Sequence, residues 1–315
     1  MKTAVTMESS FYSRFKAYLD ERFPLFSHGI LIVSYFSSNQ FLASELEHPG
    51  KPISYTLHSL FGAIILFCMF FHLRVFDEHK DYEEDLKFHP GRILQGGLIT
   101  LRDLKWFGAA AILCELVLSL ICGIPAVAAA LIAIFFSVLM LREFFISGWL
   151  KRHFLAYAIS HMLIMPLFAL FVFSVTTGKF PWEAPGWFWI YAFVGFFVTF
   201  NWEMSRKIRA PGDEIEGLKS YSKIFGTYGA AYMVILIRVI DTFMVFLVGW
   251  HLKLSPLFYI ILIVLFLVCC IGLWQFRFNT CRKTAKMMEV YAGMYIIAFD
   301  LTLAVELIRK NGLEF

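Results

Sequence analysis

The sequence has few charged residues for its length. Only 17% of its 315 residues are charged, whereas 59% are hydrophobic. Soluble domains carry about 25% charged residues, so this composition argues against a soluble protein. The formal net charge is +4, which provides no large basic surface, and no nucleic-acid partner is predicted.

The sequence also lacks the cysteine spacings of zinc sites and disulfide-rich proteins. Its six cysteines lie in or beside apolar runs and form no CxxC or Cys/His ligand pattern, so they are interpreted as packing residues. No cleavable signal peptide is predicted, because residues 1–23 carry charges at both ends and no apolar core. Residues 11–19 are instead typical of an amphipathic helix lying on the cytoplasmic face.

Long apolar runs are what the sequence does contain. A helix of about 20 apolar residues crosses the hydrocarbon core of a bilayer, and nine runs approach that length. The pattern predicts an all-α, polytopic membrane protein. A single membrane domain is expected at 24–308, between a cytoplasmic amphipathic segment, 1–23, and a short C-terminal tail, 309–315. The predicted spans are 24–44, 54–76, 105–122, 125–142, 154–176, 186–205, 227–249, 256–276 and 289–308.

The basic residues are distributed unevenly between the two sets of loops. If the N-terminus is cytoplasmic, most of the 28 Lys and Arg residues fall in cytoplasmic segments. The positive-inside rule therefore predicts a cytoplasmic N-terminus. It also places two long charged loops, 77–105 and 206–225, in the cytoplasm. In a bacterium the protein would lie in the inner membrane.

The first of these loops opens with a run of acidic residues from Asp77 to Asp85. Asp77, Asp81 and Asp85 recur at every fourth residue, so on a continuous helix they would lie within roughly 80° of one another. Such crowding is unfavourable unless a cation lies between the carboxylates. Mg²⁺ suits this pattern, since it is usually held by one or two carboxylates plus phosphate oxygens.

The spacing of the acidic residues alone allows two interpretations of this run. Arg92 follows at a distance where its guanidinium could grip a phosphate in bidentate fashion, which favours a metal and phosphate site. In the other reading, the acids belong to a solvated helix beside the membrane and pair with Arg74, Lys80 and Lys87.

The second loop contains a similar mixture of charges. Glu203 and Lys207 share a helix face, and Pro211 with the glycine after it ends the helix. Asp213 follows at once. It could cap the next helical turn, but the first loop offers the complementary half of a site, and this favours metal binding.

The two loops resemble the paired aspartate motifs of the UbiA superfamily of intramembrane prenyltransferases. The first family motif runs Asn-Asp-x-x-Asp-x-x-x-Asp, and Asp77, Glu78, Asp81 and Asp85 occupy its four defined positions. A later family element, Arg-Pro-Leu-x-x-Gly, is matched by residues 92–97 except at its proline.

The second family motif, Asp-x-x-x-Asp before a glycine, is matched only in part. Residues 217–226 match its tail, which puts Asp213 on the second aspartate and Arg209 on the first. Glu203 would replace the missing carboxylate if residues 206–211 are an insertion. A basic pair between the fourth and fifth spans matches a further feature of the family.

The resemblance implies a bundle of nine helices round a central cavity. It also implies Mg²⁺-dependent transfer of a prenyl group from an isoprenyl diphosphate to an aromatic or lipid-like acceptor in the membrane. Asp81 and Asp85 are the implied catalytic residues. The implied metal ligands are Asp77, Glu78, Asp81, Asp85, Glu203 and Asp213. The implied diphosphate-binding residues are Arg92, Lys151, Arg152 and Lys207.

Three rival functions are weighed against this one. A membrane transporter would place its ionisable residues near the bilayer midplane, whereas here they gather at one rim. A CDP-alcohol phosphotransferase would carry an Asp-Gly-x-x-Ala-Arg run, which the sequence lacks. A catalytically diverged UbiA-like protein stays open because of Arg209.

Some polar residues fall inside the predicted spans. Arg238 and Asp241 are three residues apart on one predicted helix and are expected to pair, as buried charges do. The others are expected to join helices more often than to line an acceptor pocket. They are His58, His72, Glu115, His161, Asp300 and Glu306.

Overall fold

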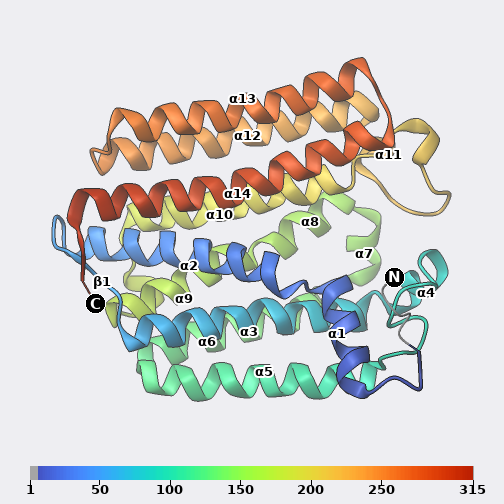
Figure 1. The fold of residues 1–315 in the computed structure, drawn as a ribbon, viewed down its shortest axis with the longest axis horizontal. Helices are drawn as coiled ribbons and strands as arrows, with labels where there is room; N and C mark the ends of the chain where they lie inside the picture. The colour runs from blue at the N-terminus through green and yellow to red at the C-terminus, as the bar shows by residue number, and fades with distance from the viewer. Residues whose placement is uncertain (1–5, 315) are drawn as a thin grey trace.

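The computed structural model describes residues 6–314, which form helices joined by short turns. The long helices lie side by side along the longest axis of the molecule (Figure 1). In chain order the α-helices are α1 (Phe11–Arg22), α2 (Leu25–Glu47), α3 (Leu57–Lys80), α4 (Tyr82–Phe88), α5 (Leu101–Cys122), α6 (Ile124–Leu141), α7 (Ser147–Arg152), α8 (Phe154–Met162), α9 (Ile164–Thr177), α10 (Gly186–Arg206), α11 (Tyr221–Phe225), α12 (Thr227–His251), α13 (Pro256–Phe278) and α14 (Arg282–Asn311).

Shorter elements complete the chain. Three 3₁₀ turns are η1 (Glu143–Phe145), η2 (Pro181–Glu183) and η3 (Pro211–Asp213). Two strands of two residues each, β1 (Ile53–Ser54) and β2 (Leu313–Glu314), pair in parallel. This pairing ties the end of the chain to the α2–α3 connection.

The all-α, polytopic fold predicted from the sequence is confirmed. Each predicted span coincides with a long helix, except that 154–176 is divided into α8 and α9. Seven segments within the described residues are long and apolar enough to cross a membrane: α3, α5, α6, α8 with α9, α12, α13 and α14. The count of nine is not confirmed, because α2 and α10 are as long but are not among these seven segments.

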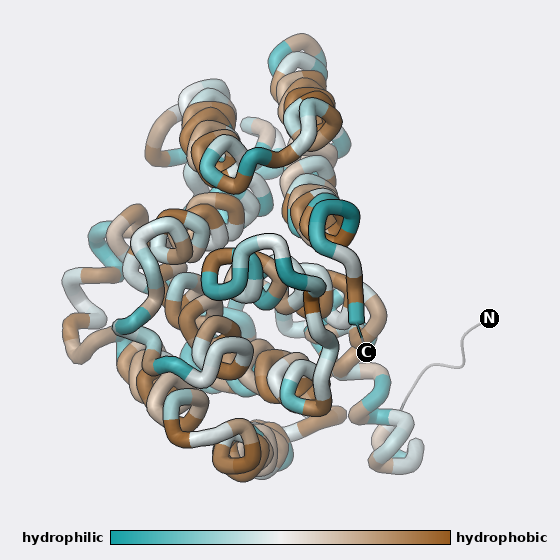
Figure 2. The backbone as a smooth tube through the Cα atoms, turned by 90° about the vertical axis from the view of Figure 1, so that its left-hand side faces the viewer, coloured by the Kyte–Doolittle hydropathy of each residue, from teal (hydrophilic) through white to brown (hydrophobic). Residues whose placement is uncertain are grey.

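Apolar side chains point both into the bundle and out of it. α9 packs against α2, α3, α6 and α10, and its Phe168, Phe171 and Phe173 are fully buried. α13 instead exposes more than half of Leu257 and of Leu267. Outward-facing leucines are stable in contact with lipid, whereas water would disfavour them. Figure 2 shows the same pattern, with brown along the helices and teal mostly in the turns.

The helix that carries the first acidic residues does not continue through the whole run. α3 ends at Lys80, Asp81 lies at a bend with φ −97° and ψ 5°, and α4 begins at Tyr82. The single stripe expected of a continuous helix is therefore not formed. Asp77 lies on α3 and Asp85 on α4, and Asp81 lies between the two helices.

The predicted N-terminal helix exists and is anchored to the first loop. Tyr18 of α1 is fully buried in a small apolar cluster with Val75, Leu94 and Leu104. Arg14 donates a hydrogen bond from Nη1 to the carbonyl oxygen of Leu98 at 3.1 Å. α1 is thereby fixed across the end of α3, next to the acidic residues.

Candidate functional site

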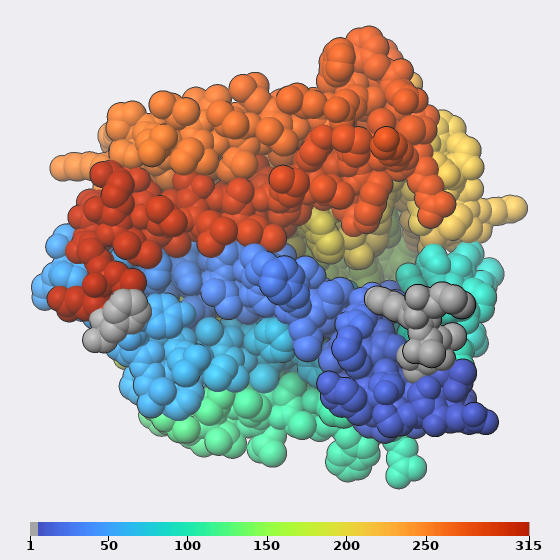
Figure 3. Space-filling view, viewed as in Figure 1, coloured from blue at the N-terminus to red at the C-terminus, as the bar shows by residue number. Residues whose placement is uncertain are grey.

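The two charged loops lie at the same end of the bundle, with α1, α4, α7 and α11 around them (Figure 1). Figure 3 shows a hollow at this end, between orange-red α14 and the blue N-terminal helices. Its floor has the yellow-green colours of the middle of the chain. Residues of the two loops also touch, because a Cβ on Gly217 would lie 3.3 Å from Cζ of Phe88.

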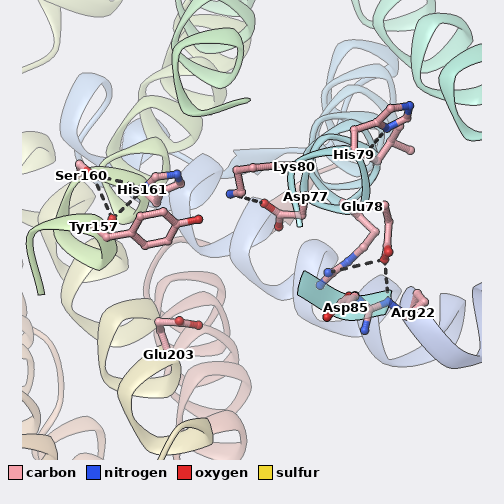
Figure 4. A network of polar contacts seen from close by, with 12 residues as sticks. Arg22, Asp77, Glu78, His79, Lys80, Asp85, Tyr157, Ser160, His161 and Glu203 are labelled. Atoms are coloured by element: carbon pink, nitrogen blue, oxygen red, sulfur yellow. Dashed lines mark hydrogen bonds and ion pairs between the residues drawn. The ribbon is translucent and has the colours of Figure 1, made fainter. Parts of the chain in front are cut away.

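Glu78 and Asp85 are held by arginines (Figure 4). Nε of Arg22 donates to Oε1 of Glu78 at 2.6 Å, and Nη2 of the same arginine lies 3.4 Å from Oδ2 of Asp85. Arg92 forms an ion pair with that same Asp85 oxygen. Arg92, which the sequence predicts as a phosphate-binding residue, therefore pairs with a carboxylate of the acidic run in this structure. The second oxygen of Glu78, Oε2, is buried without a hydrogen-bond partner among the described residues.

Asp77 points away from these arginines and towards α8. Its Oδ1 lies 3.0 Å from Nζ of Lys80, and the Lys80 ammonium lies 5.3 Å from the centre of the Tyr157 ring. His161 stacks on Tyr157 with the ring centres 4.0 Å apart, and it interacts electrostatically with Asp77. Figure 4 shows this group facing Glu203.

Asp81 lies between the two groups just described and pairs with neither of them. Its side chain makes no hydrogen bond or ion pair with any residue in the described part of the chain. Burial, together with the negative charges of Asp77, Asp85 and Glu84, raises the pKa of Asp81 to about 6 against the opposing effect of Lys80. A bound cation would relieve this repulsion.

Glu203 of α10 is almost fully buried and binds two cations. Its Oε2 accepts from Nε of Arg206 and its Oε1 lies beside Nζ of Lys207, both at 2.5 Å. Lys207 also lies 4.9 Å from the centre of the Phe154 ring. The predicted sharing of a helix face by Glu203 and Lys207 is confirmed by this ion pair.

Arg209 and Asp213 lie in the turn after α10. Nη1 of Arg209 donates to the backbone oxygen of Asp213 at 3.4 Å, and Arg209 interacts electrostatically with His89 of the first loop. The Asp213 carboxylate instead interacts with Cys281, at the start of α14. The structure therefore brings Arg209, but not the carboxylate of Asp213, towards the first loop.

The basic pair on α7 lies apart from the predicted carboxylates. Lys151 lies 3.6 Å from Oε2 of Glu143, a residue of the neighbouring turn. Arg152 is exposed and makes no contact with another side chain in the part of the chain that the structure describes.

The first loop has a donor set that suits Mg²⁺. Its candidate ligands are all carboxylates. Asp81 makes no hydrogen bond or ion pair with a described residue, and Oε2 of Glu78 is buried without a partner among them. Within the described range no group of three or more His, Cys, Asp or Glu residues could hold a metal ion by itself. Because Mg²⁺ usually takes one or two carboxylates and completes its shell with phosphate and water, these residues fit a metal shared with a diphosphate.

The second loop does not fit a metal in the same way. The sequence predicts Glu203 as a metal ligand, but in the structure each of its two carboxylate oxygens forms an ion pair with a basic side chain. Asp213, the other predicted ligand, interacts electrostatically with Cys281, at the start of α14. Three cations, Arg206, Lys207 and Arg209, outnumber the one buried carboxylate here.

Three residues of this site are not singled out by the sequence: Arg22, Tyr157 and Arg206. Arg22 is 56 residues from its partner Glu78, so no local pattern links the two. Lys80 is expected as a possible partner of the acidic run, and the structure does pair it with an acid of that run. His161 is expected only as a helix-joining or pocket residue, and its four-residue spacing from Tyr157 is a helical signal that could have found the stacked pair. Arg206 is the residue immediately before Lys207, which the sequence does predict.

Several of the polar residues inside the helices join neighbouring helices. Nδ1 of His72 lies 2.7 Å from Oε1 of Glu115, and Asp300 accepts a hydrogen bond from Ser38 at 2.6 Å. The predicted pair of Arg238 and Asp241 is confirmed, with 2.8 Å between Nη1 and Oδ2.

Comparison with known proteins identifies a family. The sequence pattern described as "UbiA prenyltransferase family" matches residues 32–297. No curated protein matches the sequence. Among solved structures, a UbiA homolog from Aeropyrum pernix K1 is similar, with a TM-score of 0.68, 13% identity, and coverage of 90% of this chain and 97% of that one.

Two further solved structures share the fold. A structure described for digeranylgeranylglyceryl phosphate synthase has a TM-score of 0.63 and 19% identity, and the match covers 94% of this chain and 99% of that one. A UbiA homolog from Archaeoglobus fulgidus bound to GPP and Mg²⁺ has a TM-score of 0.51 and 14% identity, covering 92% and 99%. At such identities the likeness concerns the fold.

Proposed function

Because the chain belongs to the UbiA prenyltransferase family, we propose that it transfers a prenyl group from an isoprenyl diphosphate to an aromatic or lipid-like acceptor within the membrane. The protein is a multi-pass membrane protein, so an acceptor with an apolar body would reach it from the bilayer. The proposed orientation puts the N-terminus and both charged loops in the cytoplasm. The charged diphosphate head of the donor would then face the cytoplasm at this end of the bundle.

The observation that carries this proposal is the gathering of unsatisfied carboxylates and cations at one end of an apolar bundle. Oε2 of Glu78 has no partner and Asp81 makes no hydrogen bond or ion pair among the described residues, while Arg92 pairs with Asp85 in the first loop and Lys207 pairs with Glu203 at the end of α10. A prenyl diphosphate has the matching division into a polyanionic head and an apolar tail. The related Archaeoglobus fulgidus protein bound to GPP and Mg²⁺ supports the same assignment.

We assign roles to the residues accordingly. The carboxylates of the first loop would hold Mg²⁺, with Asp81 and Asp85 as the catalytic pair. When bound, Mg²⁺ would neutralise charge on the leaving diphosphate. Arg92 and Lys207 would bind its phosphate oxygens. Lys151 and Arg152, both on α7, would also bind them once the diphosphate lies within their reach. The metal ligands proposed in the first loop are Asp77, Glu78, Asp81 and Asp85.

The proposal is tested in membranes that contain the protein. Labelled geranyl, farnesyl and longer diphosphates are supplied with candidate acceptors, with and without Mg²⁺. We expect Mg²⁺-dependent release of diphosphate, and a loss of at least about 100-fold in Asp81→Ala, as for removal of one electrostatic contributor to a transition state. Glu8→Ala, which removes an exposed acid from the N-terminal segment, serves as control. Release that persists unchanged in Asp81→Ala would exclude the metal site at the first loop.

A further inference from the structure

The second charged loop has the chemistry of an anion site. We propose that Arg206 and Lys207 bind the diphosphate of the donor directly, in place of a metal held by a second carboxylate motif. This inference rests on the proposed function for the identity of the ligand, although the anion site itself can be tested without it. Mg²⁺ would then serve only the side of the diphosphate that faces the first loop.

The charge at the end of α10 favours an anion over a second dication. Glu203 is the one buried carboxylate in this segment, and Arg206, Lys207 and Arg209 follow it within six residues. The three cations and one carboxylate leave a net positive charge in this segment. A divalent cation would be repelled by that net charge, whereas a diphosphate would be attracted by it.

Glu203 holds its two cations in place and leaves their other donors available. Arg206 uses only Nε towards Glu203, and its two terminal nitrogens make no hydrogen bond with any residue the structure describes. Those nitrogens can grip a phosphate in bidentate fashion. The Lys207 ammonium has three donors, and its contact with Glu203 leaves others free. Glu203 thus neutralises part of the charge of the two cations without using all of their donors.

The two cations are accessible and lie near the first loop. The side chains of Arg206 and Lys207 are 39% and 29% exposed, whereas that of Glu203 is 7% exposed. Arg206 interacts electrostatically with Asp77 across the site. In Figure 4, Glu203 lies below Tyr157, on the side that Lys80 and Asp77 face. A diphosphate between the loops could therefore touch the first-loop carboxylates through a metal and the second-loop cations directly.

The test measures binding of inorganic pyrophosphate to the purified protein in detergent by isothermal titration calorimetry. The wild-type protein is expected to bind pyrophosphate in excess EDTA, within about tenfold of its affinity in Mg²⁺. A hydrogen bond to a charged group contributes about 1.5–3 kcal/mol, so Arg206→Gln and Lys207→Gln should each weaken binding in EDTA by at least about tenfold. Lys219→Gln, which removes an exposed cation from the same loop, should leave it unchanged.

A further variant separates the anion site from a metal site. Glu203→Gln should keep or tighten pyrophosphate binding in EDTA, because it removes a negative charge. If Glu203 were a metal ligand, the same variant would lower the affinity for Mg²⁺ instead. Wild-type protein that binds pyrophosphate only when Mg²⁺ is present would overturn the proposal, and this comparison needs no variant to fold.

The outcome is independent of the prenyl-transfer assay. Pyrophosphate binding in EDTA together with no turnover of any isoprenyl diphosphate would reject the proposed function and keep the anion site. Mg²⁺-dependent turnover together with no binding in EDTA would keep the function and reject the anion site.

Discussion

Asp81→Asn is expected to make the metal-free protein more stable at neutral pH. Burial and neighbouring acids raise the pKa of Asp81 to about 6 from its ordinary value of 3.8, so the folded protein binds a proton at this position more tightly than the unfolded chain. Above pH 6 the ionised side chain therefore costs stability, by about 1–3 kcal/mol. Asparagine has the same shape without the charge, and the melting temperature should rise by several degrees.

The stability difference between Asp81→Asn and the wild-type protein should depend on pH. As the pH falls from about 6 towards 4, Asp81 takes up its proton in the folded protein and the cost disappears. The advantage of Asp81→Asn should shrink over that range. The groups that set the pKa are Lys80 and Asp77 on α3, and Glu84 and Asp85 on α4. Thermal unfolding in detergent at pH 4.5, 6 and 7.5, in EDTA, measures the difference.

A metal titration provides the control for this variant. Mg²⁺ should stabilise the wild-type protein, because a ligand that binds the folded state raises its apparent stability. It should stabilise Asp81→Asn much less. Asp20→Asn, which changes an exposed acid of α1 that pairs with Lys16, should respond to Mg²⁺ as the wild type does. An Asp81→Asn protein that is less stable than wild type at pH 7.5 would contradict the assigned environment of Asp81.

Asp241→Ala is expected to cost about 3–5 kcal/mol of stability, the range for removing one partner of a buried ion pair. Arg238 and Asp241 of α12 are both fully buried. Nη2 of Arg238 also donates to Oδ1 of Asn201 on α10 at 2.7 Å, and the guanidinium lies 3.7 Å from the centre of the Tyr295 ring on α14. Loss of Asp241 would leave a guanidinium charge uncompensated among three helices.

Two further variants make this expectation specific. Glu289→Ala breaks an ion pair with Lys286 whose lysine is 64% exposed, and it should cost no more than about 1 kcal/mol. Arg238→Leu combined with Asp241→Leu removes both charges, and it should recover much of the stability lost in Asp241→Ala. Unfolding measured in detergent compares the three. If Asp241→Ala and Glu289→Ala lowered the free energy of unfolding equally, the buried ion pair would stabilise the protein no more than the exposed one.

The class of the protein and the position of its helices could be predicted from the sequence. Apolar runs near 20 residues fix helix positions locally, because a backbone in lipid must satisfy its own hydrogen bonds. The acidic run also marked the first loop as a site, since crowded carboxylates need cations nearby. The pairing of Arg238 with Asp241 was also predictable locally, because residues three positions apart on one helix lie on the same face.

Other features depend on contacts between distant parts of the chain. The bend at Asp81 divides the acidic run between α3 and α4, although the four-residue spacing alone favours one helix. Arg22 reaches Glu78 and Asp85 only because Tyr18 anchors α1 beside α3. The sequence predicts a metal ligand in Glu203, whereas the folded chain surrounds it with Arg206 and Lys207.

The apolar runs and the placement of charge are enough to predict a membrane-embedded helical bundle with its charges concentrated in two loops. The cation that each carboxylate meets, and hence the carboxylates available to a metal, follow from the packing of helices that are distant in the sequence. The physical reason is the range of the interactions. Hydrophobic length and helical spacing act within one segment, whereas the partner of a charge is chosen by whichever helices pack against it.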